Sequence, residues 1–220
     1  MSKKVGIIGG LGPMATACLM NLLDKNIDML IINDPTTPDR TKYIIDNTSP
    51  NPTDNILSMI DKLKKYNVDI IGMPCNTASY FYEKVKDNIN CEFVSIVEET
   101  VKLINNLNIK TVGLLATDGT INSEIYKKEL DKYGIKILLP NKDNQKNVMD
   151  IIYNEVKANK KVSQDKLEMA ISDLKNQGAQ KIILGCTELS VIYENELIKD
   201  NTLVDSIKVL SNEINKRAKN

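Results

Sequence analysis

The chain has 220 residues, which is enough for one or two domains with a sizeable buried core. Its 29 basic and 29 acidic residues balance, so the sequence indicates neither a nucleic-acid partner nor a membrane surface. Histidine is absent, which removes the commonest general base from any site in the chain.

The apolar segment at residues 5–23 follows two lysines and has some features of a signal peptide. Three glycines and a proline interrupt it and no small-residue cleavage pattern follows, so a buried strand, a glycine turn and a helix explain it better. No other segment is long and apolar enough to span a bilayer, and we expect no membrane association. The four cysteines include no CxxC pair, so we expect thiols in a reducing cytoplasm.

Short apolar runs alternate with helical patterns along the first half of the chain. Strands are predicted over residues 4–9, 29–33, 68–73 and 93–97, and helices over 14–25, 53–63, 77–86 and 98–106. Residues 34–52 are rich in Pro, Thr, Asn and Asp and have no clear period. They are predicted to form a long loop, and such loops are often functional.

After residue 108 the plan restarts. Strands are predicted over residues 111–116, 136–139, 181–184 and 203–204, and helices over 123–133, 143–156, 163–177 and 206–219. Because the strands are continuously apolar and alternate with helices, the fold class is α/β, with parallel sheets covered by helices on both faces.

Two motif pairs indicate an internal duplication. VGIIGG at Val5 corresponds to VGLLAT at Val112, and IIGMPCNTA at Ile70 corresponds to IILGCTEL at Ile182. We therefore predict two similar α/β domains related by pseudo-twofold symmetry, with the active site in the cleft between them. The N-terminal domain is expected to comprise residues 1–99 plus 205–220, and the C-terminal domain residues 100–204.

Two cysteines stand where predicted strands end. Cys75 and Cys186 each precede a nearby threonine and a predicted helix start, which favours the thiolate and would lower the pKa of each thiol toward neutrality. In open parallel sheets, ligands bind beyond the carboxyl ends of the strands. Two symmetric domains would aim both sulfurs at one cleft, where one removes a proton from carbon and the other replaces it. The pattern predicts racemisation or epimerisation without a cofactor.

Other interpretations of these residues stay open. Either cysteine could be a small core residue, as Cys18 and Cys91 are expected to be. A zinc site lacks close ligand spacing, and a thiol hydrolase would need a base that the sequence does not show. Residues 10–15 fit the dinucleotide motif GxGxxA, with Asp34 about 20 residues on, and would suit an NAD-dependent oxidoreductase. A non-catalytic protein that binds an acidic amino acid is a further alternative.

At these residues the sequence resembles the aspartate/glutamate racemase family, and within it the aspartate branch. The resemblance covers essentially the whole chain and rests on GIIGGLGPMAT, DPTTPDRT, MPCNTA, EET, GLLATDGT and GCTEL. It implies two similar α/β domains, a homodimer, and racemisation of a small acidic amino acid without pyridoxal phosphate or a metal. The predicted reaction interconverts L- and D-aspartate, with glutamate as the alternative substrate.

The resemblance also assigns roles to individual residues. Cys75 and Cys186 would be the two acid/base residues, and Arg40 would bind the side-chain carboxylate of the substrate through parallel hydrogen bonds. Lys157 would lie near the substrate. Contacts to the α-carboxylate and the pocket floor are implied for Leu11, Asn76, Thr77, Ala78, Thr117, Thr120 and Thr187.

Each of these roles has an alternative. Arg40 could be a loop cation at the surface, and Lys157 lies among other lysines and could belong to a solvated face. Asn76 and Thr77 could cap the following helix. Glu188 could hold Cys186 or act as an acid in the first turn of a helix.

Overall fold

The first sheet is built by the N-terminal half of the chain. The computed structural model describes residues 3–194 and 200–219, so residues 1, 2, 195–199 and 220 of the predicted domains lie outside the described part. Four parallel strands form this sheet in the order β2-β1-β3-β4: β1 (Val5–Gly9), β2 (Met29–Asn33), β3 (Ile70–Gly72) and β4 (Glu92–Val94). Val5 pairs with Met29 on one side and Ile70 on the other.

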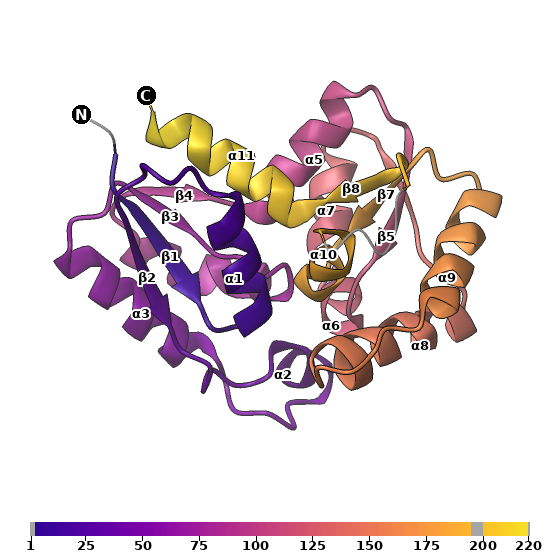
Figure 1. Ribbon diagram of the computed structural model, residues 1–220, viewed down its shortest axis with the longest axis horizontal. Helices are drawn as coiled ribbons and strands as arrows, with labels where there is room; N and C mark the ends of the chain where they lie inside the picture. The colour runs from indigo at the N-terminus through magenta and orange to yellow at the C-terminus, as the bar shows by residue number, and fades with distance from the viewer. Residues whose placement is uncertain (1–2, 195–199, 220) are drawn as a thin grey trace.

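Helices cross over between these strands and cover the sheet (Figure 1). α1 (Pro13–Leu22) begins with a proline, which suits the first turn because its missing amide is not needed there. α3 (Thr53–Lys65) buries Ile56, Met59, Ile60 and Leu63 along one stripe. The third crossover is a chain of short turns, namely the 3₁₀ helix η1 (Thr77–Phe81), α4 (Tyr82–Val85) and the 3₁₀ helix η2 (Lys86–Asn88).

The second sheet repeats the first. Its parallel strands lie in the order β6-β5-β7-β8: β5 (Thr111–Leu115), β6 (Lys136–Leu138), β7 (Lys181–Leu184) and β8 (Leu203–Asp205). Around them lie α6 (Asp118–Asn122), α7 (Ile125–Asp131), α8 (Lys142–Asp150), the π-helix η3 (Ile151–Val156), α9 (Gln164–Asn176) and α10 (Thr187–Glu194). The matching strand orders confirm the predicted α/β class with two similar parallel sheets, and they make β3 and β7 equivalent strands.

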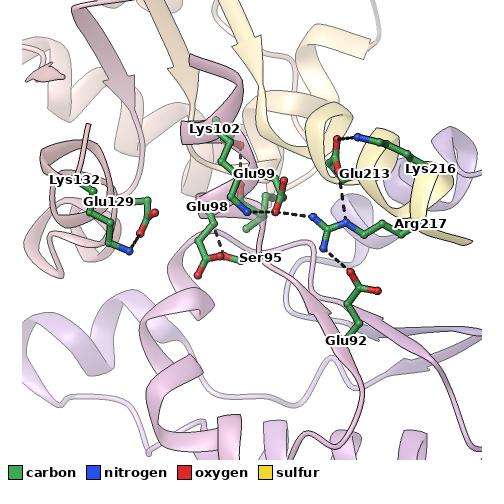
Figure 2. A network of polar contacts seen from close by, with 12 residues as sticks. Glu92, Ser95, Glu98, Glu99, Lys102, Glu129, Lys132, Glu213, Lys216 and Arg217 are labelled. Carbon is green, nitrogen blue, oxygen red and sulfur yellow. Dashed lines mark hydrogen bonds and ion pairs between the residues drawn. The ribbon is translucent and has the colours of Figure 1, made fainter. Parts of the chain in front are cut away.

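The helices that follow the last strand of each sheet pack against each other. These are α5 (Ile96–Asn106), after β4, and α11 (Ser206–Ala218), after β8. α11 also packs on β3 and β4 of the first sheet, whereas α5 packs on α7 of the second. Figure 2 shows Arg217 of α11 joined to Glu99 of α5 and Glu92 of β4. The last helix of each half therefore packs on the other half. The domain boundaries themselves stay a prediction.

The predicted loop at residues 34–52 is wrong in its middle, where α2 (Arg40–Asp46) forms. The Asp39 side chain accepts a hydrogen bond from the backbone amide of Lys42, which caps the start of this helix. The helix ends at Asn47, whose φ of 55° is left-handed. The loop therefore carries a built element, and that element fixes the position of Arg40.

Other boundaries also differ from the predicted ones. The strand expected at residues 93–97 ends at Val94, because Ser95 caps α5 by accepting from the amide of Glu98. Residues 118–122 form α6, which the sequence pattern did not predict, and Glu124, with a φ of 55°, separates it from α7. Among the described residues, no helix is long and apolar enough to cross a membrane.

Candidate active site

The two cysteines line one cavity between the halves of the molecule. Cys75 follows β3 and Cys186 follows β7, and both are buried, with 7% and 5% of their surfaces exposed. The cavity is narrow, with a volume of about 10 Å³ open to the centre of a water-sized sphere, which is room for about one water molecule. The predicted ligand-binding residues that line it with the cysteines are Leu11, Arg40, Asn76, Thr77, Thr117, Lys157 and Thr187.

Two predicted residues stand behind this lining. Ala78 is fully buried among apolar side chains of the first half, and Thr120 supports Thr77 from below. Asp39, Thr41, Tyr153 and Glu188 line the cavity without having been predicted as ligand-binding residues. Asp39 could have been found as the neighbour of Arg40, and Tyr153 as the residue four positions before Lys157, which places both on one helical face.

Gly185 brings Cys186 close to the neighbouring strand. An added Cβ at this position would lie 2.5 Å from Leu114 Cδ1, so a larger residue would force the buried Leu114 side chain to shift. α10 then begins at Thr187, directly after the thiol. Cys75 is placed differently, because the helix after it is the short 3₁₀ segment η1 and its own amide donates to the carbonyl of Met73 at 2.8 Å.

The thiol of Cys186 donates a hydrogen bond to Glu188 Oε2 at 2.9 Å. Burial and the Glu188 carboxylate raise the pKa of Cys186 well above its ordinary value, and Lys157 offsets this only in part. The expectation that the helix start lowers the pKa of this thiol is therefore wrong. Burial of the thiol, together with a carboxylate two residues away, outweighs the favourable position before α10.

Glu188 combines the two roles that the sequence left open. It lies in the first turn of α10, and its carboxylate accepts hydrogen bonds from Cys186 and, at 3.4 Å, from the Thr187 hydroxyl. Only 6% of its surface is exposed. The glycine turn of the first half closes over it, since an added Cβ at Gly12 would lie 2.8 Å from Glu188 Oε1.

Three threonine hydroxyls join the halves beneath the cavity. Thr77 Oγ1 lies 3.0 Å from Thr117 Oγ1 and 2.8 Å from Thr120 Oγ1, and all three side chains are buried. Thr117 also caps α6 by accepting from the amide of Thr120. Because each hydroxyl can donate or accept, the cluster can turn a donor of Thr77 or Thr117 toward a bound carboxylate.

The side chain of Asn76 is engaged by groups of the second half. Tyr126 donates its hydroxyl proton to Asn76 Oδ1 at 2.6 Å, and Asn76 Nδ2 donates to Ser206 Oγ at 3.0 Å. Ser206 in turn donates to the carbonyl of Leu184 at 2.8 Å. This buried chain of bonds holds the backbone next to Cys75. It leaves one side-chain amide hydrogen and the backbone N–H of Asn76 for a ligand, because the Asn76 carbonyl accepts from the amide of Ser79 at 3.0 Å.

Arg40 places a buried guanidinium at the cavity. Its nitrogens donate to the backbone carbonyls of Thr37 at 3.1 Å, of Pro38 at 2.8 Å and of Leu11, and only 8% of the residue is exposed. Nε is buried without a partner. In the described part of the chain no carboxylate forms an ion pair with this guanidinium, so neutral carbonyls hold a positive charge where an anion can approach.

Asp39, Tyr153 and Lys157 form a second polar group at the cavity. The Tyr153 hydroxyl lies 3.2 Å from Asp39 Oδ2, across the two halves, and Lys157 Nζ lies 3.8 Å from the centroid of the Tyr153 ring. Burial alone would lower the pKa of Lys157, but nearby negative charge, with Glu188 the largest source, raises it. Lys157 is itself an exposed residue, so it lies at the rim of the cavity with its ammonium over the Tyr153 ring, and the solvated-face alternative stays open.

Tyr153 belongs to the π-helix η3, and Lys157 follows its last residue. π-helices are rare and are frequently found at functional sites. The predicted continuous helix over residues 143–156 therefore changes its geometry at the point where it reaches the cavity.

The comparisons with known proteins agree with this architecture. Residues 8–214 match the family model of Asp/Glu/hydantoin racemases. The broad specificity amino-acid racemase RacX of Bacillus subtilis (strain 168) is 29% identical over 224 residues, which cover 94% of each chain.

Two solved structures show the same fold. The aspartate racemase of Picrophilus torridus is 30% identical, with a TM-score of 0.84 over 99% of this chain and 94% of that chain. The glutamate racemase of Francisella tularensis, solved with D-glutamate, is 21% identical, with a TM-score of 0.71 over 98% of this chain and 80% of that one, and supports the fold alone. Because the family match spans most of the sequence, the chain belongs to the Asp/Glu/hydantoin racemase family, in which it is an amino-acid racemase.

Proposed function

We propose that the protein interconverts L- and D-aspartate without a cofactor, and that Cys75 and Cys186 act on opposite faces of the α-carbon. The observation that supports this most strongly is the placement of both thiols. They follow equivalent strands of the two halves and line the same narrow cavity. Similarity to the aspartate racemase of Picrophilus torridus supports the choice of substrate.

The reaction needs one thiolate and one thiol at the start. The thiolate takes the α-proton and becomes a thiol, while the electron pair of the broken C–H bond spreads onto the α-carboxylate. The opposite thiol then gives its proton to the other face of the α-carbon and becomes a thiolate. Nothing is oxidised or reduced, and the two sulfurs have exchanged their protonation states.

The carbanion formed in this way is the main energetic difficulty, because an amino-acid α-proton is a very weak acid. Hydrogen-bond donors around the α-carboxylate can stabilise it as the charge develops, and one such donor can contribute about 3 kcal/mol. We assign this role to the Thr77 and Thr187 hydroxyls and to the backbone amides that follow the two cysteines. All of these belong to residues that line the cavity.

Charge favours an acidic amino acid as the substrate. Arg40 and Lys157 bring two positive charges to the cavity, and Asp39 and Glu188 bring two carboxylates. Asp39 is bonded by Tyr153 and Glu188 by Cys186, whereas among the described residues the Arg40 guanidinium is held by carbonyl oxygens. A substrate with two carboxylates supplies partners for both. We assign the side-chain carboxylate to Arg40, with Lys157 beside it, because a guanidinium fork binds a carboxylate through two parallel hydrogen bonds.

A broader range of acidic or polar amino acids is the second candidate. A wider hollow adjoins the cavity between the glycine turn and the end of η3, and both are lined by Leu11, Asp39, Arg40, Lys157 and Glu188. This hollow gives room for side chains longer than that of aspartate, and RacX, a relative of this chain, is a broad specificity racemase. We expect aspartate to react fastest, and glutamate more slowly through this hollow.

The test follows optical rotation while pure L- or D-aspartate, and separately glutamate, is incubated with the protein. We expect Cys75→Ser and Cys186→Ser each to lose racemisation by roughly 10²- to 10⁴-fold, the usual contribution of a positioned acid or base. Cys91→Ser is the matched control, because Cys91 lies before β4 and does not line the cavity. A normal rate in either Cys75→Ser or Cys186→Ser would contradict the two-base mechanism.

Exchange of the α-proton with heavy water separates catalysis from binding alone. A protein that only binds acidic amino acids would be stabilised by aspartate against heat but would exchange no deuterium into it. A homodimer is part of the proposal, and sedimentation of the pure protein tests it.

A further inference from the structure

The two halves differ at one position next to the catalytic thiols. The second residue after Cys75 is Thr77, whereas the second residue after Cys186 is Glu188. Because β3 and β7 are equivalent strands, these two side chains correspond in the duplicated plan, although Cys75 stands three residues after β3 and Cys186 two residues after β7. One thiol therefore has a neutral hydroxyl at this place and the other has a carboxylate.

The hydrogen bonds of the two thiols follow this difference. Cys186 donates its proton to Glu188 Oε2 at 2.9 Å, and both groups are buried. Thr77 is turned toward the hydroxyls of Thr117 and Thr120. In the part of the chain that the structure describes, no carboxylate accepts a hydrogen bond from Cys75. A negative charge on Cys186 would face the Glu188 carboxylate at hydrogen-bond distance in a site with little water, and this repulsion disfavours the thiolate there.

We propose that Glu188 is a positioning residue that keeps the active-site proton on Cys186 in the resting enzyme, so that Cys75 begins the cycle as the thiolate. This inference rests on the proposed two-thiol reaction and adds an order to it. When the enantiomer whose α-proton faces Cys75 binds, Cys75 is already deprotonated and can act as the base. The other enantiomer meets a thiol and must await transfer of the proton.

The difference between Thr77 and Glu188 also favours return of the two thiols to their starting protonation states after turnover. When Cys75 has taken the α-proton and Cys186 has given its own, the thiolate on Cys186 lies against the Glu188 carboxylate. Moving the proton from Cys75 back to Cys186 relieves that repulsion and leaves no net change in charge. Glu188 lines both the inner cavity and the wider hollow beside it, which places the carboxylate between Cys186 and the surface.

Other charges at the cavity oppose or support this effect. Lys157 works against it, since its ammonium favours a thiolate on Cys186, but the direct hydrogen bond to Glu188 is the closer interaction. The titratable and charged groups around Cys186 among the described residues are Cys75 after β3, Glu188 of α10, Tyr153 and Lys157 of η3 and its end, Asp39 and Arg40 at the start of α2, and Tyr126 of α7.

The test titrates each thiol in the absence of substrate. One variant carries Cys18→Ser, Cys75→Ser and Cys91→Ser and keeps Cys186, and a second keeps Cys75 instead. Ultraviolet absorption of the thiolate is followed against pH, with the thiol-free protein as the blank, so buried sulfurs are read without a reagent. We expect Cys186 to lose its proton at higher pH than Cys75.

Glu188→Gln in the Cys186 variant should move the titration midpoint to lower pH by at least about one pH unit, as expected for removal of a neighbouring charge. The same substitution should leave the midpoint of the Cys75 variant unchanged. Glu168→Gln, on the exposed face of α9, removes the same charge far from the cavity and should change neither. If Glu188→Gln does not fold, Gly12→Ala provides a second variant, because it displaces the carboxylate and keeps its charge.

The proposal is overturned if Cys186 ionises at or below the pH at which Cys75 does. It is also overturned if neither Glu188→Gln nor Gly12→Ala moves the Cys186 midpoint. Failure of the proposed function would be seen in a different experiment: the α-proton of aspartate would not exchange with solvent, while the two thiols would still titrate as expected.

Discussion

Gly12 shows how a missing side chain governs the site at the scale of one residue. Its φ of −159° is extended backbone that any residue can adopt, so the turn itself does not need glycine. An added Cβ would instead lie 2.8 Å from Glu188 Oε1, and the next nearest atom, Ala15 Cβ, is 3.6 Å away. Glycine is needed at this position to leave room for the carboxylate that holds Cys186.

Gly12→Ala should therefore change chemistry more than stability. We expect the free energy of unfolding in urea to change by less than about 0.5 kcal/mol, because only the flexible end of Glu188 must move. Racemisation should fall about 10- to 100-fold, the loss expected when a group in the site is misplaced by about 1 Å. In a Glu188→Gln background the same substitution should have much less effect on racemisation. Equal losses of activity in both backgrounds would show that Gly12 acts independently of Glu188.

At the scale of elements, helix ends and short helices place the side chains of the site. α2 begins with Arg40, α10 begins next to Cys186, and η3 leads to Lys157. Asn76, four residues after the end of β3, is held by α7 and by the start of α11 through Tyr126 and Ser206. Elements of the second half therefore fix the backbone beside the thiol of the first.

Tyr126→Phe tests this connection between elements. Burial raises the pKa of Tyr126, so its hydroxyl stays protonated and donates to Asn76 Oδ1. Phenylalanine leaves that buried oxygen without its donor, and we expect the free energy of unfolding in urea to fall by about 1 to 3 kcal/mol. Tyr133→Phe, at a half-exposed ring beyond α7, is the control and should change it little. Equal stability of the two variants would show that this bond contributes nothing.

At the scale of the whole molecule, α5 and α11 hold the two halves together behind the site. Arg217 of α11 bonds Glu92 and Glu99, each at 2.8 Å, and lies 3.5 Å from Glu213 (Figure 2). Glu99 is 7% exposed and also pairs with Lys102 at 2.7 Å. The cluster joins β4, α5 and α11, so it bears on how the two sheets sit relative to each other.

Arg217→Ala should destabilise the molecule as a whole. Removing the cation leaves Glu99 buried with only Lys102 as its partner, and we expect a loss of about 1 to 3 kcal/mol, less than for a fully buried pair because Arg217 is partly exposed. Lys132→Ala removes the nearby pair with Glu129, in which the lysine is exposed, and should cost less than about 1 kcal/mol. Urea unfolding measures both. Similar losses for the two would mean that the cluster behaves as ordinary surface charge.

Much of the fold was accessible from local pattern alone. Buried parallel strands are continuously apolar, so all eight described strands were predicted within a few residues, and the paired motifs indicated the duplication. α2 and α6 were missed because they are short and lack an apolar period. They form where caps start them and where they pack on each other across the halves, with an added Cβ at Gly119 reaching to 2.7 Å from Thr41 Cα.

The sequence by itself determined the duplicated α/β plan and the thiols at matched strand ends, because periodicity and motif spacing are local properties. The expected roles of Arg40 and Lys157 came from the family resemblance. Only the tertiary structure decided that Tyr153 meets Asp39, that Asn76 is held by Tyr126, and that Cys186 is bound to Glu188. The protonation of a thiol depends on its burial and on the charges that distant segments bring beside it. Two cysteines in nearly equivalent sequence contexts can therefore have different chemistry.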